Sequence, residues 1–148
     1  MSIDLIGNAR PAAAAVAQLN GAAHELAAEA GLSPLLVELV QIRASQLNGC
    51  AHCLRAHIRK AAGAGETPER LGLVAAWREA AYFDETERAA LELTEAITFV
   101  ADGHVPEELI AGVRKVLTDA QYTAVAWLAI AINTYNRAFI TGHPEVAP

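Results

Sequence analysis

Helical periodicity runs along this chain from end to end, and it limits the possible fold more than any other feature. Apolar residues recur at spacings of three and four, and no segment shows the period-two alternation of a strand. At 148 residues the chain has the length of one domain. We therefore expect a single all-α domain over residues 1–148, and a thioredoxin fold, which needs a sheet, is excluded.

Glycine, proline and capping residues divide the pattern into about seven helices. Two capping boxes are expected, at Asp84-x-x-Glu87 and at Thr118-x-x-Gln121. The approximate expected bounds are 11–30, 34–47, 50–62, 68–77, 84–103, 106–117 and 118–139. The helix over 34–47 is apolar on nearly all sides, so we expect it to be deeply buried, with Glu38 in its middle.

Both cysteines of the chain stand in one short motif, Cys50-x-His52-Cys53, with His57 four residues further on. Two thiols at this spacing can close into a disulfide or share a metal ion. Cys50 opens a helix, where free backbone amides favour an anion, whereas Cys53 has His57 one turn later to accept its proton. A structural zinc site would need a second pair of ligands, and the sequence has no such pair.

Glu38 is the carboxylate best placed to orient His57. A glutamate inside an apolar helix is costly unless it is paired, hydrogen-bonded or protonated. Histidine in a proton relay commonly uses a carboxylate as its orienting partner. The sequence thus indicates a relay from Cys53 through His57 to Glu38. We expect the other histidines, His24, His104 and His143, to be ordinary polar residues near the surface.

The composition of the chain indicates which binding partners and which cellular location to expect. The formal net charge of −6 gives no basic stripe, so we expect no nucleic-acid binding. No apolar run is long enough to span a membrane. Two cysteines in one motif argue against a secreted disulfide framework, so we expect a cytoplasmic protein. Hydrophobic residues make up 53% of the chain, which favours a homo-oligomer with helical interfaces.

The spacing Glu38, eleven residues, Cys50-x-His52-Cys53, three residues, His57 resembles the active-site signature of the AhpD-like alkylhydroperoxidases in the carboxymuconolactone decarboxylase superfamily. Two further stretches are similar to this family, the run 43–50 before the thiols and the run 132–137 in the last helix. The resemblance covers about residues 32–137, which we take as the core of the domain.

The resemblance implies a compact all-α fold, a trimer or a hexamer built from trimers, and a thiol peroxidase cycle. Cys53 would attack a small hydroperoxide and become a sulfenic acid, and Cys50 would donate a proton and then form the disulfide. His57 and Glu38 would form the proton relay, with His52 as an auxiliary residue. No bound cofactor or metal is implied, and a lipoyl-bearing or thioredoxin-like dithiol protein would reduce the disulfide.

Two other functions are compatible with this fold. One is a lactone decarboxylase or related carbon-acid enzyme, with His57 and Glu38 as acid and base. That chemistry does not need two thiols, so the cysteine pair favours the peroxidase. The other is a noncatalytic redox-sensing or assembly protein, in which the cysteine couple forms but does not turn over peroxide.

Overall fold

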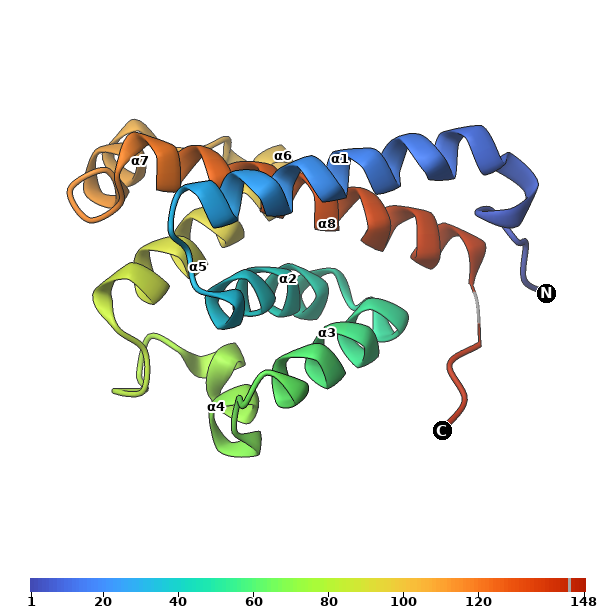
Figure 1. Cartoon of the computed structure of the whole chain (residues 1–148), viewed down its shortest axis with the longest axis horizontal. Coiled ribbons are helices and arrows are strands. Elements are labelled where there is room, and N and C mark those ends of the chain that lie inside the picture. Colours follow the sequence, from blue (N-terminus) through green and yellow to red (C-terminus); the bar gives the residue numbers. More distant parts are fainter. Residues whose placement is uncertain (144) are drawn as a thin grey trace.

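A central helix, α2, is enclosed by the other long helices in the computed structural model, which describes residues 1–143 and 145–148 (Figure 1). The described residues form eight α-helices and no strand, so the all-α prediction is confirmed. The bounds are α1 Arg10–Glu29, α2 Pro34–Asn48, α3 Ala51–Gly63, α4 Pro68–Leu73, α5 Glu85–Thr98, α6 Val100–Gly103, α7 Glu107–Val113 and α8 Asp119–Gly142, with 3₁₀ turns at Gly7–Ala9 and Val74–Ala76.

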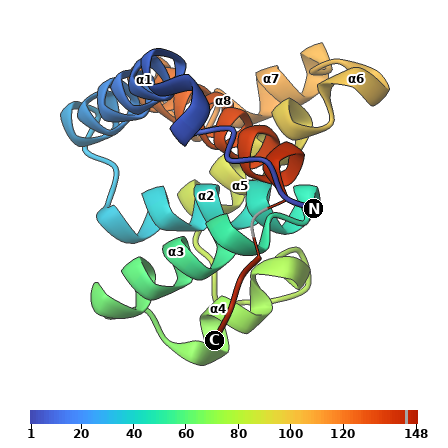
Figure 2. The same cartoon turned by 90° about the vertical axis from the view of Figure 1, so that its right-hand side faces the viewer.

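The two longest helices, α1 and α8, lie side by side in opposite directions and form one layer of the molecule (Figures 1 and 2). Below them lie α2 and α3, with α4 on the far side of α3 (Figure 2). None of the helices in the described ranges combines the length and the apolar character needed to cross a membrane.

The joint between α2 and α3 sets the position of the cysteines. Ser33 caps the start of α2 by accepting a hydrogen bond from the Leu36 amide at 3.1 Å. The helix ends at Gly49, whose φ of +70° is a left-handed conformation that glycine adopts without strain. Cys50 follows at once as the N-cap of α3.

Two departures from the expected helices have local causes. The segment expected as one helix over 84–103 is divided at Phe99 into α5 and α6. Thr94 and Thr98 both donate their hydroxyls to the carbonyl four residues back, at 2.7 Å, a pattern that bends helices. Helix α7 ends at Val113, earlier than expected. Both predicted capping boxes are confirmed.

The segment expected as a helix over 68–77 is also shorter. Helix α4 stops at Leu73, and a 3₁₀ turn leads to Trp77. Trp77 is 4% exposed and donates its indole N–H to Glu95 at 2.8 Å. This hydrogen bond fixes the Trp77 side chain against α5.

Helix α2 is as deeply buried as its composition predicts, because α3, α5 and α8 all pack against it. The core falls into three clusters of buried apolar side chains. The smallest contains both cysteines and lies where α2, α3 and α8 meet, and its buried members are Ala44, Cys50, Cys53 and Ile132. The sequence motif is therefore placed inside the fold rather than on an exposed loop.

Candidate active site

The two cysteines are free thiols at the start of α3, with Cys50 as the N-cap and Cys53 in the first turn. Cys50 is 2% exposed and Cys53 is 3% exposed. The backbone amide of Cys53 donates to Cys50 Sγ at 3.4 Å, so Cys50 caps the helix with its sulfur. Cys50 thus stands at the start of this helix, where the sequence analysis expected a helix to begin.

The Cys53 thiol is strongly held in its protonated form. Burial, and after it a hydrogen bond with Cys50, raises the pKa of Cys53 to about 12, and the nearby amide of Asn136 acts in the opposite direction. A thiol with this pKa carries almost no thiolate at neutral pH. Cys53 can therefore act as a nucleophile only if another group takes its proton at the moment of attack.

His57 and Glu38 form the pair that the sequence predicted. The Nδ1 atom of His57 lies 2.7 Å from Glu38 Oε2, and the two side chains are 11% and 12% exposed. When Nδ1 carries the proton, it donates a hydrogen bond to the Glu38 carboxylate, and Nε2 of the neutral ring is then an acceptor. The structure thus joins α2 and α3 through a buried carboxylate–imidazole contact.

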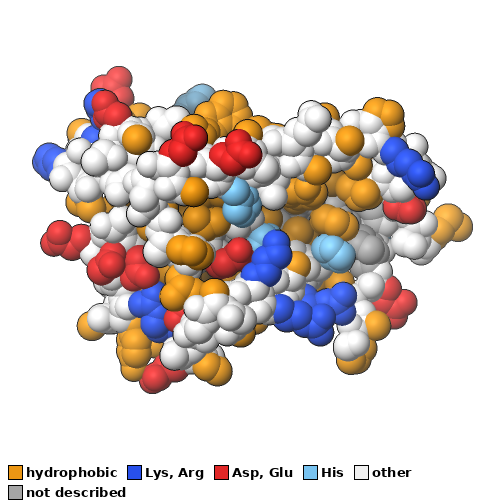
Figure 3. Space-filling model, in the orientation of Figure 1, with side chains coloured by type: hydrophobic (Ala, Val, Ile, Leu, Met, Phe, Trp, Pro, Cys, Tyr) orange, Lys and Arg blue, Asp and Glu red, His pale blue; other side chains and the backbone are white. Residues whose placement is uncertain are grey.

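Cys53 and His57 share a cavity of about 170 Å³ between α1, α3 and α8. In the face shown in Figure 3, histidine side chains gather in the middle band beside recessed apolar side chains, between the α1/α8 layer and α3. The cavity is lined by Asn20, Gln41, His52, Cys53, Ala56, His57, Lys60, Ile132, Tyr135 and Phe139. A small organic molecule in this cavity would meet a thiol and an imidazole together.

His52 takes no part in the contact between His57 and Glu38. Its ring stacks on Phe139, with centroids 3.9 Å apart and planes 20° from parallel. The same two residues also line a second cavity of about 330 Å³, whose lining is Gly49, Cys50, Ala51, His52, Phe139, Ile140, His143 and Val146. Cys50 lines this second cavity, and Cys53 lines the first.

The asparagines of α8 mainly tie helices together. Asn136 is fully buried and donates to Ser45 Oγ at 3.0 Å. Asn48 donates to the side-chain oxygens of both Asn133 and Asn136 at 2.9 Å. These bonds fix the end of α2 against α8 directly before the cysteines. Asn136 also lies within hydrogen-bonding reach of the Cys53 thiol.

Gln41 is a cavity residue that the sequence analysis missed. It is 1% exposed, and its amide nitrogen lies 3.4 Å from His24 Nε2. His24 in turn binds the Asn20 carbonyl oxygen through Nδ1 at 2.8 Å, so it is half-buried rather than a surface residue. The available signal was a second polar residue in the apolar helix, one turn after Glu38. His104 and His143 are exposed, as expected.

Among the side chains described, no three His, Cys, Asp or Glu residues are grouped closely enough to hold a metal ion. The carboxyl group of Glu38 is instead in contact with His57, and the sulfur of Cys50 caps its own helix.

Comparison with known proteins agrees with this arrangement. The model of the carboxymuconolactone decarboxylase family matches residues 11–96, which is more than half of the chain. The chain belongs to this family. Within the family it is AhpD-like, and the match includes α2, the cysteine motif and most of α5.

Two relatives of this carboxymuconolactone decarboxylase family member are informative. Uncharacterized protein YdfG of Bacillus subtilis (strain 168) is 41% identical over 103 residues, which cover 70% of each chain. The crystal structure of ATU0492 from Agrobacterium tumefaciens is similar over 100% of this chain and 99% of that one, with a TM-score of 0.90 and 26% identity. ATU0492 is a protein of unknown function that has been suggested to be an antioxidant defence protein, AhpD.

Proposed function

We propose that this protein is a thiol-dependent alkylhydroperoxide reductase that serves in antioxidant defence. The observation that carries the proposal is the cavity shared by Cys53 and His57, with His57 held by Glu38 at 2.7 Å. A buried thiol and a base that has its own carboxylate partner line the same cavity, and this supports the activation of a nucleophile of high pKa.

In the first step a small hydroperoxide, ROOH, enters the cavity of Cys53. His57 takes the thiol proton while the sulfur attacks the terminal oxygen and the O–O bond breaks. The alkoxide that leaves accepts the proton from His57 and departs as ROH. Cys53 becomes a sulfenic acid, and Glu38 stabilises the imidazolium while it exists.

In the second step Cys50 attacks the sulfenic acid sulfur. An S–S bond forms between Cys50 and Cys53, and the sulfenic oxygen leaves with two protons as water. The hydrogen bond that the Cys53 backbone amide donates to Cys50 Sγ, at 3.4 Å, supports this step, because it holds the Cys50 sulfur close to residue 53. An external dithiol then returns both cysteines to the thiol state. The protein supplies no reductant of its own in this cycle.

Assembly and location belong to the same proposal. Large apolar side chains remain exposed on α8, with Trp127 at 42% and Ile130 at 38%. Such residues favour association between copies of the chain, so we propose a homo-oligomer, a trimer or a hexamer, that works in the cytoplasm. Light scattering coupled to size-exclusion chromatography measures the mass, and a monomer would contradict the assembly.

The lactone decarboxylase chemistry would use the same His57 and Glu38 as acid and base. It gives no role to the two thiols that meet at the start of α3, so we favour the peroxidase. The redox-sensing alternative uses the same cysteine pair, and it differs from the peroxidase only in that the disulfide forms without repeated turnover of peroxide. Both are tested by the variants below.

Single Cys53→Ser and Cys50→Ser variants separate these functions. Each is assayed with tert-butyl hydroperoxide and excess dihydrolipoamide. We expect Cys53→Ser to consume no peroxide above the background rate. We expect Cys50→Ser to react once, leaving a sulfenic acid that dimedone traps on Cys53, and then to stop. Wild-type peroxide consumption by both variants would exclude the proposal, and oxidation of the wild-type protein without turnover would favour the redox sensor.

A further inference from the structure

The cavity that Cys53 and His57 share is cationic, although the protein as a whole is acidic. Among the described residues that line it, none is Asp or Glu, and Lys60 is the one Lys or Arg. The whole of α3 has no acidic residue, whereas the formal net charge of the chain is −6. Lys and Arg side chains lie over α3 in Figure 3, beside the histidines of the middle band.

Three helices each contribute to this lining a hydrogen-bond donor that has no acceptor among the residues that the structure describes. They are the amide of Asn20 in α1, the ammonium of Lys60 in α3 and the hydroxyl of Tyr135 in α8. The amide nitrogen of Gln41 is already engaged, at 3.3 Å from the Val37 carbonyl oxygen and 3.4 Å from a histidine nitrogen. Donors of this kind are satisfied by an anionic oxygen, and the ammonium adds a preference for negative charge.

The position of Lys60 relative to the thiol sets the length of a ligand. Lys60 follows Cys53 by seven residues, two helical turns, so both lie on the same face of α3 with about 10.5 Å between their Cα atoms. Helical side chains tilt towards the N-terminus, which brings the ammonium back towards His57 and Cys53. Lys60 is exposed and Cys53 is 3% exposed. The thiol thus lies at the inner end of the cavity and the cation at its outer end.

We propose that the substrate is a short hydroperoxide that carries a carboxylate, and that Lys60 is the specificity-determining residue that binds this carboxylate. The inference rests on the proposed function, because it names the substrate class of that cycle. One ammonium balances the single charge of a carboxylate, whereas a phosphate monoester carries about −1.5 to −2. The cavity of about 170 Å³ is little larger than one of about 150 Å³ that holds benzene, so the chain between the two groups is short.

A pair of probes with the same shape and different charge tests the proposal. They are 4-hydroperoxy-4-methylpentanoate and its neutral amide, 4-hydroperoxy-4-methylpentanamide. The value of kcat/KM is measured for each with excess dihydrolipoamide at low ionic strength. We expect the wild type to prefer the carboxylate by about tenfold, and we expect added salt to reduce this preference because the lysine is exposed.

Two substitutions at Lys60 and one beside it complete the test. Lys60→Gln should lower kcat/KM for the carboxylate about tenfold, mainly through KM, and leave the amide within about twofold. Lys60→Glu should prefer the amide. Arg59→Gln is the matched control, because Arg59 is the neighbouring cation, is also exposed and does not line this cavity. It should leave both probes within about twofold of the wild type.

The outcomes separate this inference from the proposed function. Equal kcat/KM values of the wild type for the two probes, or a preference that persists in Lys60→Gln, would overturn the inference and leave the peroxidase in place. An equal loss in Arg59→Gln would overturn the assignment to Lys60. A wild-type protein that turns over neither probe would overturn the proposed function, and the inference with it.

A structural role for Lys60 predicts a different result. Lys60 stands in the last turn of α3, where a positive charge stabilises the helix. If that were its whole role, Lys60→Gln would lower the urea midpoint without changing the ratio of kcat/KM between the two probes, and the inference would be wrong. The neutral amide serves in the same assay as the check that each variant keeps an intact site.

Discussion

Glu38 and Glu95 are two carboxylates with almost the same burial and very different partners. Their side chains are 12% and 14% exposed. Glu38 accepts one hydrogen bond, from His57. Glu95 accepts three, from Arg43 Nε at 2.8 Å, Trp77 Nε1 at 2.8 Å and Arg78 Nη1 at 2.6 Å. The number and kind of donors therefore separate the two groups, and depth in the protein does not.

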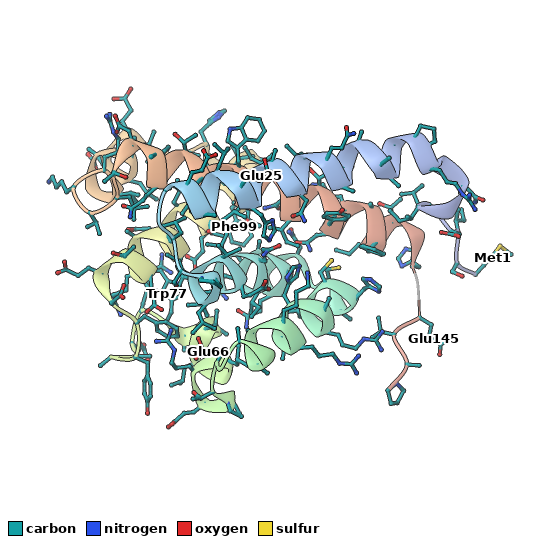
Figure 4. The ribbon with its side chains drawn as sticks, in the orientation of Figure 1. Met1, Glu25, Glu66, Trp77, Phe99 and Glu145 are labelled. Carbon is teal, nitrogen blue, oxygen red and sulfur yellow. The ribbon has the colours of Figure 1, made fainter. Side chains whose placement is uncertain are left out.

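The donors decide what each carboxylate can do. Burial by itself would raise the pKa of Glu95, but the hydrogen bonds from its three donors outweigh this effect and hold the pKa below its ordinary value of 4.5. Glu95 is thus a fixed anion that joins α5 to α2 and to Trp77. Glu38 has a single partner, the imidazole of His57, which lines the cavity of Cys53. Figure 4 places Trp77 well away from the start of α3.

The largest effect should come from replacing the two carboxylates in turn. We expect Glu38→Gln to lower peroxide turnover by about 10²–10⁴-fold, the usual contribution of general acid–base catalysis, because His57 loses its orienting anion. Glu95→Gln should leave the rate per folded molecule within about twofold. Initial rates with tert-butyl hydroperoxide and dihydrolipoamide measure both, with circular dichroism as the check on folding.

A matched pair of histidine variants sharpens this test. His57→Asn should lose as much activity as Glu38→Gln, and the double variant should lose little more, because the two residues act as one unit. His104→Asn, at an exposed position, is the control. A Glu95→Gln variant that loses as much activity per folded molecule as Glu38→Gln would break the division between the two carboxylates.

For stability we expect the opposite ranking, with Glu95→Gln the more damaging variant, and an effect smaller than the effect of Glu38→Gln on activity. Glu95→Gln leaves Arg43 and Trp77 with weaker acceptors, and we expect a loss of about 1–3 kcal/mol in the free energy of unfolding. The Arg78 side chain is 54% exposed, so its ion pair with Glu95 is screened by solvent and contributes less to this loss. Glu38→Gln can still accept from His57, so its loss should stay below about 1 kcal/mol. Urea denaturation at pH 7 ranks the two variants, and the opposite ranking would contradict the comparison.

The sequence predicted the Glu38 pair and missed the Glu95 cluster, for a physical reason. Glu38 stands inside an apolar helix at a fixed spacing from the thiols, so its burial and its partner both leave a pattern. Glu95 lies in a helix whose polar side is rich in charge, and its partners come from α2 and from the segment after α4. Periodicity and capping patterns describe one helix at a time and hold no information on such contacts.

The same limit applies to the two cavities. The Cys-x-x-Cys motif and the start of α3 could be predicted from local residues, and the helix starts at Ser33, Asp84 and Thr118 followed from capping. The stack of His52 on Phe139 could not, because it depends on how α8 crosses α3. The sequence thus indicates the candidate reacting groups, and only the packing of the helices shows that the two cysteines line different cavities.

The smallest effect concerns the charge of Glu95 and is seen as a function of pH. Because folding lowers the pKa of Glu95 below 4.5, its charge stabilises the fold above that pH, and this stability is lost as the pH falls through the folded pKa. The wild type and Glu95→Gln should therefore differ most in free energy of unfolding near pH 7 and converge as the pH falls below 4.5 and through the folded pKa. Urea midpoints measured at intervals from pH 7 to pH 3 follow this difference. A gap that stays constant or widens towards acid would show that neutral hydrogen bonding, rather than charge, makes Glu95 a structural residue.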